Sequence, residues 1–410
     1  MNSIWLAAFL LLSLKVQAQP YIKGGNTRHR FAQLNVGVDF RFFNSSQSNT
    51  NIIDEAGNKE NKPLGNLQEG RIIIGGTHFW GKADFYMAFP VAKSSENGFS
   101  TGVDLGARYF PCRIKHKRVS PFVGISILET RFKQGDGMLQ KRFKYPAMAG
   151  VVYNFRNHLF ELSAGYNYSN TTNYYISKQE QVKIKTQPFW ISAGYKFMLE
   201  TTLSAEKNWQ SGKTKLLTDT LAKLKRLNGI TFGVGPSSAF FLKKSSHNKL
   251  VAPYIDNHKA TVFPEFTVGY YLHKPDAQLN FVFRNLKSEI NGYDFFQQAK
   301  RKAFSFEAYK FFADYNGFAA FAGVVISYEK LYIRDKVAGI EINHKNYQNI
   351  KPALTLGWDI RPNRIQSWYL RTHVRYFPNM NLDMPDDKNF SFDQLEFNFI
   401  QLVIFPGRMF

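Results

Sequence analysis

Single-residue alternation of apolar and polar side chains runs through much of this 410-residue chain. The segment 33–43 is a clear case: one face carries Leu34, Val36, Val38, Phe40 and Phe42, and the other carries Gln33, Asn35, Gly37, Asp39 and Arg41. A period of two residues is that of a β-strand whose two faces meet different surroundings. The segments 101–110, 160–168 and 191–197 repeat the pattern. The chain is therefore predicted to be all-β.

The composition indicates which surroundings the two faces meet. Aromatic residues make up 16% of the chain, with 39 Phe and 21 Tyr, yet the mean hydropathy is −0.33. A transmembrane β-barrel produces this combination, because its strands alternate apolar residues facing lipid with polar residues facing the interior. A helical membrane protein would need runs of about 20 apolar residues, and the sequence contains none. We therefore predict a transmembrane antiparallel up-and-down β-barrel fold.

The alternation predicts about sixteen strands. Their expected ranges are 31–43, 69–79, 83–92, 98–111, 119–133, 143–155, 157–168 and 188–199 in the first half, and 229–242, 259–272, 277–289, 301–313, 318–333, 350–361, 367–377 and 393–405 in the second. Short turns alternate with longer polar loops such as 44–68 and 169–187. Barrels in the outer membrane have short periplasmic turns and longer outer loops, so the N-terminus is expected in the periplasm.

The first residues are typical of a secretory signal peptide. An apolar run from Ile4 to Leu14 is too short to span a membrane and is followed by Val16-Gln17-Ala18, a small-x-small-like cleavage site. The segment 1–18 is thus expected to be removed, although the usual basic residue before the apolar run is missing. The single Cys112 cannot form an internal disulfide.

Residues 200–228 lack the alternation of their neighbours and are predicted to be a periplasmic linker, with a short helix over Thr218–Leu227. They separate two units, 19–199 and 229–410. Phe122-Val123-Gly124 and Phe321-Ala322-Gly323 occupy corresponding places in the two units, which indicates an internal duplication. Two arrangements remain open: two tandem 8-stranded barrels, or one 16-stranded barrel. The long linker and the many small inward residues favour two narrow barrels, because a wide pore does not need a small-residue lining.

Charged residues on the inward faces are the candidate site. They are Asp39, Arg41, Asp104, Arg108, Glu161 and Lys196 in the first unit, and Glu265, Arg284, Glu307, Glu329, Asp359, Arg371 and Arg375 in the second. Inside a narrow barrel such charges have to pair, because an unpaired buried charge is costly. The expectation is an ion-pair network that fills the lumen. The alternative is a polar channel lining that selects solutes.

The net charge of +22 would suggest a nucleic-acid partner for a basic intracellular protein, but an exported chain meets no nucleic acid. The expected anionic partners are outer-membrane lipids and lipopolysaccharide.

Each half resembles the small OmpA-like and OmpX-like outer-membrane barrels of Gram-negative bacteria. The resemblance rests on Pro121-Phe122-Val123-Gly124, on Gly165-Tyr166-Asn167-Tyr168, on Gly194-Tyr195-Lys196-Phe197 and on the aromatic-rich last strand before Phe410. It implies eight up-and-down strands per half, location in the outer membrane, and recognition of the C-terminal strand by the barrel-assembly machinery. Pro406-Gly407-Arg408-Met409 interrupts the alternation just before the end, so the recognised strand is expected to stop near Phe405.

The sequence contains no nucleophile elbow, phosphate-binding loop or zinc-protease motif. We therefore expect no enzymatic activity, no cofactor and no metal site. A structural or interaction role, as an accessory subunit of an outer-membrane complex, is the expected function. The alternative is passive conduction of small solutes through a single 16-stranded barrel.

Overall fold

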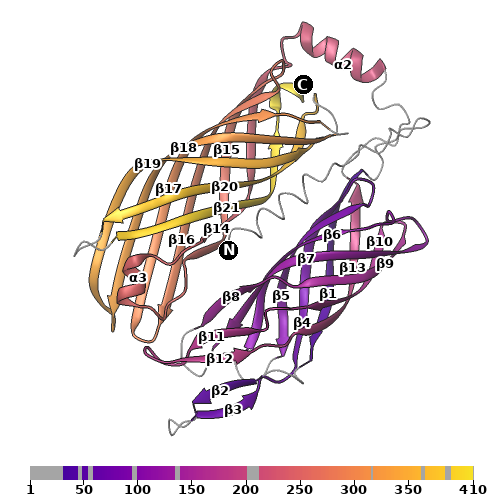
Figure 1. Ribbon diagram of the computed structural model, residues 1–410. Coiled ribbons are helices and arrows are strands. Elements are labelled where there is room, and N and C mark those ends of the chain that lie inside the picture. The colour runs from indigo at the N-terminus through magenta and orange to yellow at the C-terminus, as the bar shows by residue number, and fades with distance from the viewer. Residues whose placement is uncertain are drawn as a thin grey trace.

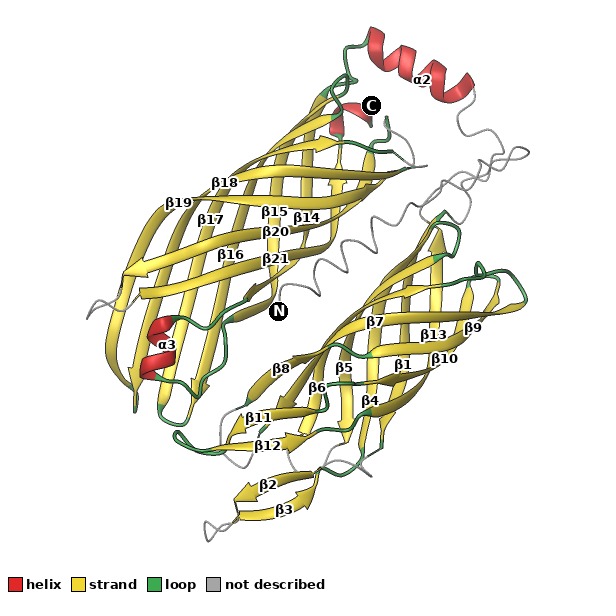
Figure 2. Cartoon of the chain, viewed as in Figure 1, coloured by secondary structure: helices red, strands yellow, loops and turns green. Residues whose placement is uncertain are grey.

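The computed structural model describes residues 31–44, 49–53, 59–94, 99–133, 139–200, 212–314, 317–361, 365–383 and 389–409. These residues form mainly β-strands, as the alternation predicts (Figures 1 and 2). The expected signal peptide and Phe410 lie outside the described residues. Within the described residues, no helix has the length and apolar character that a membrane crossing requires.

The second half of the chain forms a closed eight-stranded barrel. Every strand is antiparallel to its neighbours in sequence, and the first strand pairs with the last. The strands are β14 (Gly229–Phe241), β15 (Lys259–Leu272), β16 (Ala277–Gly292), β17 (Phe295–Phe311), β18 (Phe318–Val337), β19 (Ile340–Ile360), β20 (Trp368–Asp383) and β21 (Asn389–Ile404). All eight predicted strands of this half are therefore confirmed.

The first half forms a second, ring-like sheet. Its ring strands are β1 (Ala32–Phe43), β4 (Leu67–His78), β5 (Ala83–Ser94), β6 (Phe99–Tyr109), β7 (Arg118–Phe132), β9 (Ala147–Phe155), β10 (His158–Tyr166) and β13 (Phe189–Glu200). Consecutive members of this series pair with one another, and β13 pairs with β1. A short strand, β8 (Gln140–Lys144), precedes β9 and also pairs with β7.

Two segments expected as polar loops contain additional strands. They are β2 (Asn49–Ile53), β3 (Lys59–Pro63), β11 (Thr171–Tyr175) and β12 (Gln181–Lys185), which together form a four-stranded sheet. Tyr174, Val182 and Ile184 are buried, so this sheet has a small apolar face. Runs of five residues are too short for their alternation to stand out from chance, which explains why the segments were expected as loops.

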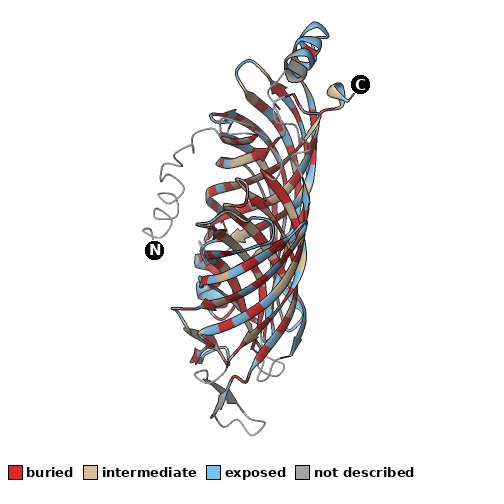
Figure 3. Ribbon diagram, turned by 90° about the vertical axis from the view of Figure 1, so that its right-hand side faces the viewer, coloured by how far each residue is buried: buried red, intermediate tan, exposed pale blue. Residues whose placement is uncertain are grey.

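The two faces of the ring and barrel strands have the inverse character of a water-soluble sheet. On β1, Val38 and Phe40 are about half exposed, whereas Asp39 and Arg41 are buried. Figure 3 shows the same alternation of buried and exposed residues along neighbouring strands. The interior is polar and the outer wall is apolar, as expected for strands whose outer face meets lipid.

The helices lie at opposite ends of the second-half barrel (Figure 1). The linker helix α2 (Gly212–Lys223) begins and ends earlier than the predicted range of 218–227. It ends here because Lys225 has a positive φ of 56° and the Arg226 N–H bonds back to the Leu221 carbonyl, which is a helix-terminating geometry. At the other end, α3 (Ser246–Val251) lies in the β14–β15 loop, where no helix was predicted.

Candidate functional site

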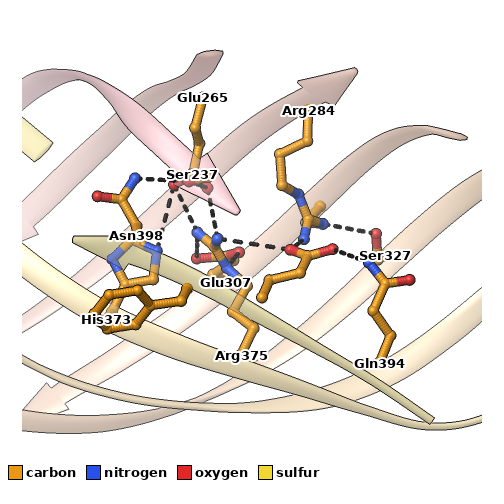
Figure 4. A network of polar contacts seen from close by, with 12 residues as sticks. Ser237, Glu265, Arg284, Glu307, Ser327, His373, Arg375, Gln394 and Asn398 are labelled. Carbon is orange, nitrogen blue, oxygen red and sulfur yellow. Dashed lines mark hydrogen bonds and ion pairs between the residues drawn. The ribbon is translucent and has the colours of Figure 1, made fainter. Parts of the chain in front are cut away.

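The interior of the closed barrel contains an arginine bound between two carboxylates. Arg375 of β20 donates through Nη1 and Nη2 to Glu265 of β15, at 2.7 and 3.0 Å, and through Nε to Glu307 of β17, at 2.6 Å. All three side chains are at most 1% exposed. The strands that carry them are not neighbours in the barrel, so these bonds cross its lumen (Figure 4).

A second cluster lies beside the first and centres on Glu396 of β21. Glu396 pairs with Arg284 of β16 and Arg301 of β17, while Arg301 also donates to both carboxylate oxygens of Glu329 at 2.5 Å. Two cations therefore face two carboxylates, all fully buried. This balance of charge allows the groups to be buried at a tolerable cost.

Towards the α2 end lies a third group, which centres on Arg371 of β20. Arg371 donates through Nε and Nη2 to the two oxygens of Asp359, at 2.8 and 2.9 Å. Its Nη2 also donates to Gln278 of β16 at 2.8 Å, again across the interior. Its guanidinium carbon lies 5.0 Å from the ring centre of Tyr309 and 5.1 Å from that of Phe321, so aromatic rings occupy the space around the charge.

The ring-like sheet of the first half holds two comparable groups. In the first group, Arg71 and Arg41 both donate to Asp104, at 2.8 and 2.6 Å, and Arg71 also pairs with Asp39. The second group comprises Asp84, Arg108, Glu161 and Lys196, which are joined by contacts of 2.7–3.2 Å. Each group has two carboxylates and two cations.

Small inward residues let large side chains occupy the remaining interior. A Cβ atom added to Gly165 would lie 2.1 Å from the indole of Trp190, and one added to Gly106 would lie 2.2 Å from the ring of Tyr86. The guanidinium of Arg41 in turn lies 3.9 Å from the centre of the Trp190 ring. The inward glycines thus accommodate bulky neighbours, which is the geometry of a narrow barrel filled by its own side chains.

All ten residues proposed from the sequence as a lumen charge network are buried and ion-paired. These are Asp39, Arg41, Asp104, Arg108, Glu161, Glu265, Arg284, Asp359, Arg371 and Arg375. Four further members were missed: Arg71, Asp84, Arg301 and Glu396. The sequence could have identified them, because each occupies a position whose side chain points inward in the alternating pattern of its strand. Arg71, between Gly70 and Ile72, is an example. That these residues form a functional site stays a prediction.

The β14–β15 loop closes the α3 end of the barrel with buried polar contacts. The His247 Nε2 lies 2.9 Å from Asp335, Asn248 donates to Gln297 at 2.8 Å, and His258 bonds to Ser288 at 3.0 Å and to Gln297 at 2.8 Å. Burial lowers the pKa of His258 to about 4, so this imidazole is neutral when the loop is in place. The described residues contain no cluster of three His, Cys, Asp or Glu suited to a metal ion.

No family model matches the sequence, and no curated protein matches it. Among solved structures, the chain is similar to Neisserial surface protein A, at 11% identity and a TM-score of 0.31, over 43% of this chain and 96% of that one. An outer membrane channel from Pseudomonas putida F1 matches at 8% identity and a TM-score of 0.21, over 91% of this chain and 95% of that one. The translocator domain of the autotransporter NalP from Neisseria meningitidis matches at 8% identity and a TM-score of 0.21, over 98% and 96%. TM-scores this low assign no function to this chain, and the resemblance to OmpA-like barrels stays a prediction.

Proposed function

We propose that this chain is an outer-membrane protein made of two filled eight-stranded barrels in tandem, with a structural or interaction role as an accessory subunit of an outer-membrane complex. The observation that carries the proposal is the binding of Arg375 to Glu265 and Glu307 across the lumen. A conducting pore needs an open path for water, whereas here charged side chains from opposite walls meet. The barrels would then anchor the loops at the α3 end outside the cell and α2 in the periplasm.

Equivalent packing in the two halves supports the tandem arrangement and the duplication. On the fifth ring strand, Phe122 is buried, and a Cβ added to Gly150 of the sixth strand would lie 2.7 Å from its ring. On the fifth strand of the closed barrel, Phe321 is buried, and a Cβ added to Gly357 of the sixth would lie 2.6 Å from its ring. The same aromatic residue thus covers a glycine at the same place in each unit.

Contacts between the halves support a fixed pair rather than two independent barrels. At the α3 end, Lys259 pairs with Glu129 and Arg142 pairs with Asp256. Nearer the α2 end, the rings of Phe79 and Phe318 lie 5.0 Å apart and those of Phe85 and Trp358 lie 5.8 Å apart. Two barrels held at both ends would form one rigid platform in the membrane, as suits a subunit that presents loops to a partner.

Accessibility of cysteines in intact cells tests the proposed placement. Cys112 is exposed in the β6–β7 turn, which the proposal places in the periplasm. In a Cys112→Ser background, Lys249→Cys in the β14–β15 loop should react with a membrane-impermeant maleimide in intact cells. Leu217→Cys of α2, in the same background, should react only after the outer membrane is permeabilised, and so should Cys112 in the wild-type chain. Labelling of Leu217→Cys in intact cells, or no labelling of Lys249→Cys, would contradict the proposed topology.

A further inference from the structure

The outward face of β16–β19 carries an ordered boundary between apolar and basic residues. The register aligns Phe283, Phe304, Tyr328 and Ile350 in one row across the four strands. The next row towards the α3 end is Asn285, Lys302, Lys330 and Gln348, and the one after it is Lys287, Lys300, Tyr332 and Asn346. The first row, three aromatic residues and Ile350, ends the apolar wall and is called the aromatic row. The two rows directly beyond it contain two lysines each.

We call Lys287, Lys300, Lys302 and Lys330 the lysine cluster, and its members lie in repulsive positions. Lys287 is directly opposite Lys300, and Lys302 is directly opposite Lys330. Like charges directly opposite one another destabilise an antiparallel pair. A sheet without an anionic partner would gain stability by exchanging either member of each pair for a neutral residue.

The carboxylates of the chain itself offset little of the repulsion between these lysines. Lys287 pairs with Glu289 at 2.7 Å. The other three lysines of the cluster form no ion pair with any carboxylate of the described residues, and all four are exposed. Glu289 also attracts Lys300, so four lysines against this one carboxylate leave a net charge of +3 in the cluster.

Tyrosine rings hold part of the cluster against the wall. The Lys330 Nζ lies 5.7 Å from the ring centre of Tyr328, and the Lys300 Nζ lies 5.9 Å from that of Tyr332. Cation–π contacts at such distances restrain an exposed ammonium group. Tyrosine also prefers the interface between hydrocarbon and headgroups, so both lysines are held at headgroup level.

We propose that the lysine cluster binds the phosphates of a glycolipid headgroup in the outer leaflet, with the acyl chains against the aromatic row below. This inference rests on the proposed function, because it needs the apolar wall to lie in the membrane and the α3 end to face outward. Ammonium groups are strong phosphate ligands, and a phosphate shared by Lys302 and Lys330 would turn their repulsion into attraction. Two phosphates on one headgroup would match the two opposed lysine pairs.

The test compares Lys300→Gln/Lys302→Gln/Lys330→Gln with a matched control, Lys183→Gln/Lys185→Gln/Lys249→Gln. The control removes the same charge from exposed lysines of β12 and α3, away from the barrel wall. Binding of bisphosphorylated lipid A to the refolded full chain would be measured in neutral detergent. Each basic residue near an anionic surface strengthens binding about fivefold, so we expect at least a tenfold loss for the cluster variant and less than a twofold loss for the control.

Additional measurements distinguish binding of the lipid A phosphates by the lysine cluster from other outcomes. Lipid A without its phosphates should bind the wild-type chain as weakly as lipid A binds the cluster variant, and millimolar inorganic phosphate should not displace lipid A. Equal lipid A affinity for wild type and the cluster variant would overturn the inference, as would displacement by inorganic phosphate alone. Flotation of both proteins with neutral lipid vesicles reports membrane insertion separately. Insertion without lipid A binding contradicts the lysine site only, whereas failed insertion of the wild-type chain contradicts the proposed function.

Discussion

Arg375 and Glu265 form a bidentate ion pair between strands that are not neighbours in the barrel. The two donor–acceptor distances are 2.7 and 3.0 Å, and the residues are 110 positions apart in the sequence. Such a contact forms only where the lumen is narrow enough for side chains from opposite walls to meet. The contact thus joins two walls of the barrel, and in the proposed filled barrel it would leave no open path for water at this level.

Replacing Arg375 with Met should destabilise the protein strongly. Glu265 and Glu307 would lose their shared counter-ion while remaining buried, and breaking a buried ion pair on one side typically costs about 3–5 kcal/mol. Urea unfolding of the refolded protein, compared with that of the exposed-site control Arg118→Met, measures the loss. Adding Glu265→Gln and Glu307→Gln to Arg375→Met should restore part of it. Equal midpoints for Arg375→Met and the control would contradict the pairing.

A larger side chain at Gly165 should also destabilise the first-half sheet. The Cβ of Gly165→Val would lie 2.1 Å from Trp190, a side chain that is 1% exposed and cannot move without disturbing Arg41. Overpacking of this kind costs about 1–3 kcal/mol. Gly229→Val is the control, because an added Cβ there meets nothing within 4 Å. If the two variants unfold at the same urea concentration, the space beside Gly165 is not filled by the indole.

Glu129 and Lys259 should be energetically coupled, although they belong to different halves of the chain. Their side chains are 2% and 10% exposed, so little solvent screens the pair. A double-mutant cycle with Glu129→Gln and Lys259→Gln should give a coupling of about 1–3 kcal/mol in urea unfolding. Strictly additive effects of the two changes would show that the halves do not meet at this contact in the folded protein.

Docking of the β14–β15 loop should weaken as the pH falls from about 6.5 to about 4. The pKa of His258 is lowered from 6.5 to about 4 by burial. In this window the undocked loop binds the proton and the docked loop does not, so acid favours undocking by up to about 3 kcal/mol. The hydrogen bond to Gln297 and the charge of Asp335 both raise the pKa of His258 but oppose the effect of burial only in part.

Hydrogen exchange over α3, corrected for the intrinsic effect of pH, measures this docking equilibrium. His258→Gln can still bond to Ser288 and Gln297 but does not titrate. The variant should therefore lose most of the acid-induced exchange of residues 246–251. An unchanged pH dependence in His258→Gln would show that His258 is not the group responsible for the effect.

The strands were predictable from the sequence because the alternation of polar and apolar residues within each strand reflects the surroundings of its two faces. Asp39 and Arg41 between Val38, Phe40 and Phe42 show a polar interior and an apolar exterior without any knowledge of neighbouring strands. The long ends of β18 and β19 were not predicted, because the sequence alternates only where the two faces of a strand meet different surroundings. At residues 340–350 both faces of β19 are largely exposed, so the residues there show no alternation.

The partners within the lumen could not be predicted from the sequence. The alternation of side chains along β20 identifies Arg375 as a lumen residue. Strand tilt and register, however, decide that it contacts Glu265 of β15 rather than a carboxylate that is nearer in the sequence, such as Asp359. The contacts of His247 and His258 depend on a loop that folds over the barrel end, for which the sequence carries no periodic signal. Side-chain direction is thus a local property, whereas pairing across the lumen depends on the closure of the whole barrel.

Conductance of the refolded full-length protein in a planar lipid bilayer tests the filled-barrel account most directly. Flotation with the same lipids would first establish insertion, and a general porin would serve as the conducting control. We expect no stable conductance steps from the inserted protein, because the Arg375 and Glu396 clusters would obstruct the closed barrel and the Asp104 and Glu161 groups would obstruct the ring-like sheet. Large, stable steps in the range of 16-stranded pores would contradict it and would reassign the inward charges to a selective channel lining.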